Sequence, residues 1–150
     1  MTSIHIAHLA LMEAADQLRL AFKARCVNGE AWSLNGGAGA AFDVEVSSSG
    51  SGLMFQADVA TVADAARVQV YEMLLQYNAL WTQTGGARMA LGSLPGPVVM
   101  MLELPASEVT APRIGEVLTN MTRSLDAWRA MILACGAGIG ELPEVEAACA

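Results

Sequence analysis

Apolar residues recur every three or four positions along three segments of the chain, which predicts three amphipathic helices. The first covers residues 4–25, the second runs from Thr61 to about Leu80, and the third begins near Thr110 and ends at Gly136. The second helix is apolar around most of its circumference, so it must be covered on more than one side. We expect its own sheet to cover one side and a second subunit to cover the other.

Apolar and polar residues alternate between these helices, as is typical of half-buried strands. Residues 42–46 and 53–59 flank a serine-rich turn and predict an antiparallel hairpin, with a short strand at 31–34 before it. Residues 87–91 and 97–104 predict a second hairpin after the pair Gly85-Gly86. The expected order is α-β-β-β-α-β-β-α, which indicates an α+β domain with a twisted antiparallel sheet.

The boundaries of this domain follow from the same pattern. We assign residues 1–135 to one domain, because 150 residues suffice for a single core. We interpret residues 136–150 as a flexible C-terminal tail, because they lack a sustained apolar period.

The composition and charge exclude several classes of function. The chain is 54% hydrophobic and 15% charged, which favours an apolar surface shared with another chain. Its net charge of -7 argues against nucleic-acid binding, which needs clustered Lys and Arg. The sequence shows no apolar run that would insert into a membrane and no charged start typical of a signal peptide. We therefore expect a cytoplasmic protein with reduced cysteines.

Candidate catalytic and metal-binding residues are few. His5 and His8 lie three positions apart on the first helix, too few ligands for a metal site, and Cys26 lacks a further histidine that could act as its base. The glycine-rich runs 36–42 and 136–141 do not match the phosphate-binding pattern and lie in no βαβ unit. We expect no catalytic residue, no metal and no cofactor, and hence no enzyme.

Several large apolar residues fall outside the expected core alternation. Met54, Val99 and Met101 lie on the opposite faces of their strands, and Leu9 and Met12 widen the apolar face of the first helix. Two interpretations stay open. Helices or a second subunit cover these residues, or they form an exposed surface that binds a partner chain, for which adaptable methionines are well suited.

The segment 74–91 resembles a known family. It reads LLQYNALWTQTGGARMAL: a leucine-rich helix end with Asn78, a polar turn with a glycine pair, and then a strand. Together with the later strand and the final helix bearing Trp128, this order resembles class I type III secretion chaperones, the Tir-chaperone (CesT-like) family. The loop at 36–40, the serine-rich turn and the tail depart from the family pattern.

The resemblance implies a homodimer and a partner. The dimer would be built on the second helix and the strand after it, and we assign its interface to Val70, Leu74, Tyr77, Trp81, Met89 and Leu91. The N-terminal chaperone-binding region of a secreted effector would bind in extended form, over apolar patches and by strand addition. We assign effector binding to Leu9, Met12, Met54, Val99 and Met101. The chaperone would keep the effector soluble and deliver it to the export apparatus, with the export ATPase as a further candidate partner.

Two alternatives to the chaperone hypothesis stay open at this stage. The first is a YbjN-like regulatory binding module of the same fold. The second is a small dimeric α+β enzyme whose site would include His5, His8 or Cys26.

Overall fold

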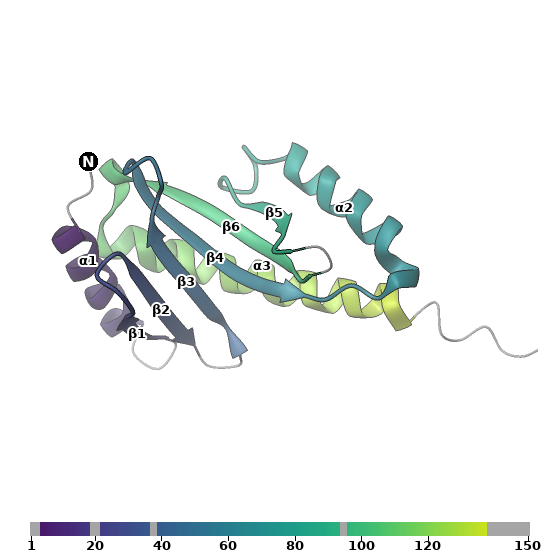
Figure 1. Ribbon diagram of the computed structural model, residues 1–150, viewed down its shortest axis with the longest axis horizontal. Helices are drawn as coiled ribbons and strands as arrows, with labels where there is room; N and C mark the ends of the chain where they lie inside the picture. The colour runs from purple at the N-terminus through teal and green to yellow at the C-terminus, as the bar shows by residue number, and fades with distance from the viewer. Residues whose placement is uncertain (1–3, 19–21, 37–38, 94–95, 138–150) are drawn as a thin grey trace, which may run out of the picture.

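The computed structural model describes residues 4–18, 22–36, 39–93 and 96–137. It contains one six-stranded antiparallel sheet in the order β1-β2-β3-β4-β6-β5, together with three α-helices. Helix α3 runs behind the sheet along its length, α1 lies at the β1 end, and α2 stands beside β5 at the other end (Figure 1). The elements are α1 (Ile4–Gln17), β1 (Phe22–Cys26), β2 (Ala31–Gly36), β3 (Ala41–Val46), β4 (Gly52–Ala60), α2 (Arg67–Ala79), β5 (Arg88–Leu91), β6 (Val98–Pro105) and α3 (Ala111–Ala137).

The α+β class, the antiparallel sheet and both predicted hairpins are confirmed. The first helix, however, ends at Gln17 rather than at Arg25, and residues 22–26 form a further strand, β1. This strand pairs with β2 from Phe22 opposite Gly36 to Cys26 opposite Trp32. The ladder hydrogen bonds of this hairpin replace the last helical turns that the apolar period had predicted.

The second helix begins later than the sequence predicts. Residues 61–63 are not helical, a 3-10 turn follows at Asp64–Ala66, and α2 begins at Arg67. The third helix begins and ends close to the predicted residues. Residues 138–150, expected to be a flexible tail, lie outside the described part of the chain.

The hydrophobic core lies between the inner face of the sheet and the helices α1 and α3. The sheet contributes fully buried aromatic side chains, among them Trp32, Phe42 and Phe55. Helix α3 covers them with a row of buried residues at helical spacing: Ile114, Leu118, Met121, Leu125, Trp128 and Ile132. Each such side chain contributes about 1.5–3 kcal/mol on burial, so α3 is the main cover of the sheet.

Two further contacts tie the far end of the fold to α3. The rings of Tyr77 on α2 and Trp128 on α3 pack edge to face, with their centroids 5.3 Å apart. The guanidinium of Arg129 donates hydrogen bonds to the carbonyl oxygens of Val59 and Asp58, where the β4–β6 ladder is irregular. These contacts fix α2 and the end of β4 against the same helix.

Two glycines should respond in opposite ways to replacement by alanine. A side chain at Gly52 would collide with the backbone carbonyl of Leu104 on the neighbouring strand, whereas a side chain at Gly115 on α3 meets no atom within 4 Å. We expect Gly52→Ala to lower the free energy of unfolding by about 1–3 kcal/mol. Gly115→Ala should raise it by about 0.5–1 kcal/mol, because alanine favours helix. Urea denaturation measures both, and equal effects of the two changes would contradict this packing.

Candidate functional site

The residues expected at a dimer interface divide into buried and exposed groups. Val70, Leu74 and Met89 are buried within the subunit, with exposed fractions of 1%, 6% and 6%. Tyr77 and Leu91 are partly buried, whereas Trp81 is 50% exposed. Of this group, Trp81 therefore offers the largest apolar surface to another molecule.

Tyr77 links α2 to its surroundings through its hydroxyl as well as its ring. Burial raises the pKa of this hydroxyl, which forms hydrogen bonds with Thr84 and Ser124. The side chain therefore stays neutral at physiological pH and is engaged inside the subunit.

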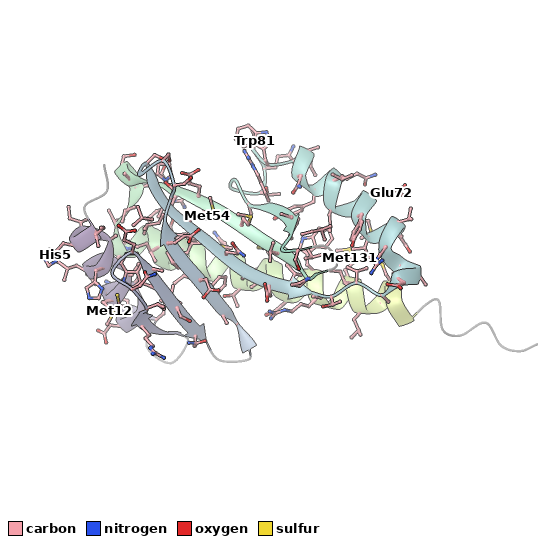
Figure 2. The ribbon with its side chains drawn as sticks, in the orientation of Figure 1. His5, Met12, Met54, Glu72, Trp81 and Met131 are labelled. Carbon is pink, nitrogen blue, oxygen red and sulfur yellow. The ribbon has the colours of Figure 1, made fainter. Side chains whose placement is uncertain are left out.

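A groove of about 620 Å³ lies between the end of α2 and the outer face of the sheet. We call it the α2 groove. It brings together Met54 and Met101, expected to bind an effector, with Trp81 and Met89, expected to form a dimer. Figure 2 shows Met54 over the central strands and Trp81 at the end of α2. The complete lining is Ser51, Met54, Asn78, Trp81, Gly86, Arg88, Met89, Ala90, Met101, Leu102, Glu103 and Pro105.

The wall of the α2 groove is partly charged. The guanidinium of Arg88 lies 5.7 Å from the ring centroid of Trp81, within range of a cation–π contact. On the other side, a carboxylate oxygen of Glu103 accepts a hydrogen bond of 3.0 Å from the hydroxyl of Ser51. Val99 lies on the same sheet face, but only 2% of it is exposed, so it offers little surface for a direct contact.

Asn78 closes the outer edge of strand β5. Its side-chain amide donates to the carbonyl oxygen of Met89 at 2.9 Å, and its side-chain oxygen accepts from the backbone N–H of Met89 at 2.7 Å. The amide thus takes the place of a neighbouring strand at an edge that would otherwise be open for pairing. The sequence marked Asn78 as part of the family pattern, between a leucine-rich helix and a glycine pair, but not as this edge contact.

The opposite edge of the sheet is strand β1. The N–H of Val27 donates to the carbonyl oxygen of Ala31, so the backbone groups of Val27 face β2. Two residues earlier in the same hairpin, the backbone groups of Arg25 face β2 as well. Because backbone groups alternate in direction, those of Ala24 and Cys26 face away from the sheet. Within the described ranges no other backbone group pairs with them, so this edge can accept a further strand.

Helix α1 lies against β1 and has an exposed apolar side. We call Ile6, Leu9 and Met12 the α1 stripe; their exposed fractions are 57%, 56% and 41%. The buried side of α1 carries mostly small residues: Ala7, Ala10, Leu11, Ala14 and Ala15. The expected effector-binding residues Leu9 and Met12 are therefore accessible next to the open edge of the sheet.

The residues on which an enzyme would depend lie outside the groove that the described residues form at α2. The α2 groove contains none of His5, His8 and Cys26. The described part of the chain holds no group of three or more metal-binding side chains. A search of the described helices finds none that is long and apolar enough to cross a membrane.

Comparison with known proteins gives a family and a fold. A model of the Tir chaperone protein (CesT) family matches residues 43–129. A search of curated proteins finds no match.

Three solved structures share the fold at low sequence identity. A chain in the ExsC-ExsE complex is 13% identical, with a TM-score of 0.63, covering 88% of this chain and 97% of its own. One in the heterodimeric ExoU-SpcU complex from the type III secretion system of Pseudomonas aeruginosa is 16% identical, with a TM-score of 0.57 and coverage of 81% and 93%. One in the HopA1-SchA chaperone-effector complex is 10% identical, with a TM-score of 0.58 and coverage of 85% and 95%.

Replacing Asn78 should open the edge of β5. In Asn78→Ala both polar groups of Met89 lose their partner, so we expect a loss of about 1–3 kcal/mol in the free energy of unfolding. The amide hydrogen of Met89 should also exchange faster with solvent. The control is Gln76→Ala, because Gln76 is an exposed residue of the same helix. Unchanged exchange at Met89 in Asn78→Ala would show that the edge is not closed in this way.

Proposed function

Because the chain belongs to the Tir chaperone protein (CesT) family, we propose that it is a type III secretion chaperone. It would bind the N-terminal region of a secreted effector, keep that region soluble and competent for secretion, and deliver it to the export apparatus from the cytoplasm. The family match favours this function over a YbjN-like regulator. The observation that carries the proposal is this match, combined with an exposed apolar helix beside an open sheet edge.

The effector segment is expected to dock at the β1 end of the sheet. An extended peptide binds a sheet by pairing its backbone with an edge strand and by placing alternate side chains in apolar contacts. Asn78 blocks such pairing at Met89 on the β5 edge, whereas Ala24 and Cys26 on β1 point their backbone groups outward. The α1 stripe is the exposed side of the helix that packs on the same strand, and it would receive the apolar side chains.

A second copy of the chain is the occupant that we propose for the α2 groove. Helix α2 exposes Val68 and Leu75, with exposed fractions of 73% and 69%. Trp81, which follows shortly after the end of this helix, borders the groove. An apolar surface of this kind on a soluble domain favours contact with another chain. In a dimer of this kind, Met54 and Met101 would be covered by the second subunit. Their assignment to effector binding stays a prediction, as does that of Val99.

Substitutions on the α1 stripe should weaken effector binding without affecting assembly. We expect Leu9→Asp or Met12→Asp to abolish co-purification of the first ~100 residues of the effector, a length that can wrap a surface of this size. The candidate effector is the product of the adjacent gene. Leu133→Asp is the matched control, because Leu133 is 74% exposed on α3. Retained binding in both stripe variants would place the effector elsewhere.

Substitution of Trp81 should separate the subunits. We expect Trp81→Asp to give a monomer by light scattering coupled to size-exclusion chromatography, because a carboxylate would be buried against apolar groups. Leu133→Asp should leave the dimer intact. Leu74→Asp is less informative, since Leu74 is only 6% exposed and its replacement would destabilise the subunit itself. A dimeric Trp81→Asp variant would move the interface away from the α2 groove.

A further inference from the structure

One hydrogen bond joins helix α1 to the sheet through a histidine. The indole Nε1–H of Trp32 on β2 donates to Nδ1 of His8 at 3.0 Å. Trp32 is 1% exposed, while His8 is partly exposed. Among the described residues this is the one side-chain hydrogen bond between α1 and another element.

The bond requires a neutral imidazole. An indole N–H can only donate, so a buried tryptophan needs an acceptor. Neutral histidine provides one when its proton is on Nε2, which leaves Nδ1 free to accept. In the protonated ring both nitrogens carry hydrogen, so turning the ring over does not restore an acceptor. Protonation would therefore leave a buried donor facing another donor, which is unfavourable.

Apart from this bond, helix α1 is held by apolar contacts with α3 and β1. Its buried side consists of four alanines and Leu11, which bury much less apolar area than the long side chains of α3. The loss of one hydrogen bond, typically worth about 0.5–1.5 kcal/mol, should therefore weaken the attachment of α1 to the sheet without detaching the helix.

We propose that His8 and Trp32 form a pH-sensitive latch that holds α1 on the sheet at neutral pH and loosens it on acidification. Histidine is the side chain that ordinarily changes charge between pH 5 and 8. The latch itself is inferred from the hydrogen bond between His8 and Trp32 in the chain without a partner. Its consequence, that acidification weakens the α1 stripe as a binding surface, rests on the proposed function.

Other titratable groups around α1 do not offer the protonated ring a buried partner. Those described on α1, β1 and β3 are all exposed to solvent: His5, Glu13, Asp16, Arg25, Cys26, Asp43 and Glu45. The charged residues described on α3 are exposed, paired with acidic residues or bound to β4: Arg113, Glu116, Arg123, Asp126 and Arg129. Neither set includes a buried carboxylate that would stabilise an imidazolium at His8.

Hydrogen exchange of the α1 amides, corrected for the intrinsic pH dependence, tests the latch in the free protein. Between about pH 7 and about pH 5.5, which spans the usual range of histidine, we expect protection of α1 to fall about tenfold. His8→Asn places an amide oxygen at the position of Nδ1 and does not titrate, so its protection should not change with pH. His8→Leu removes the acceptor and should lower protection already at pH 7.

The second histidine supplies the matched control. His5→Asn removes the other imidazole of the chain and should keep the full pH response. An unchanged wild-type protection, or the same fall in His8→Asn, would overturn the latch. Nitrogen NMR of His8 gives an independent readout on the unmutated protein, and a proton on Nδ1 at neutral pH would also overturn it. No effector is used, so these outcomes are separate from success or failure of the chaperone proposal.

Discussion

The contact between α3 and the inner face of the sheet is the constraint on which the rest of the structure depends. Residues from Ile114 to Ile132 form a buried row behind the sheet and share one core cluster with the aromatic rings of three strands (Figure 1). With α3 occupying most of this face, α1 packs at one end through small residues. Helix α2 packs beside β5 at the other end and buries only Val70 and Leu74 (Figure 1). The accessible apolar surfaces on α1 and α2 are consequences of this arrangement.

The two edge strands of the sheet differ in whether their outward backbone groups are paired. This difference gives the molecule two distinct ends. At β5, Asn78 satisfies the backbone of Met89 and so blocks strand pairing at that residue. At β1, the outward backbone groups keep their capacity for pairing, and a helix with an exposed apolar side lies next to them. A partner that pairs with the sheet and a partner that fills the α2 groove would therefore not compete for the same surface. That is the arrangement expected of a protein that assembles with itself and also holds another chain.

The sequence predicted much of the fold, but it assigned to separate surfaces some residues that the structure brings together in one groove. Alternation along β4 and β6 correctly placed Met54 and Met101 outside the most buried face, because each strand's pattern is local, although Val99 on the same side of β6 is buried. Residues 22–26 were misassigned because their apolar spacing also fits a helix, and pairing with β2 decided the outcome. Val70 and Leu74 were expected at a subunit interface because the sequence shows α2 to be apolar on several sides. It does not show which of those sides the same subunit buries.

The sequence by itself determined the fold class, the order of most elements and the resemblance to a chaperone family, because these depend on periodicity and residue type. Only the tertiary structure placed Met54 and Met101 in one groove with Trp81, paired Asn78 with Met89, and set His8 against Trp32. These contacts join residues from different elements, the last of them 24 positions apart in the chain. They arise from the crossing of packed elements, and no local pattern of apolar and polar residues encodes which side chains meet there.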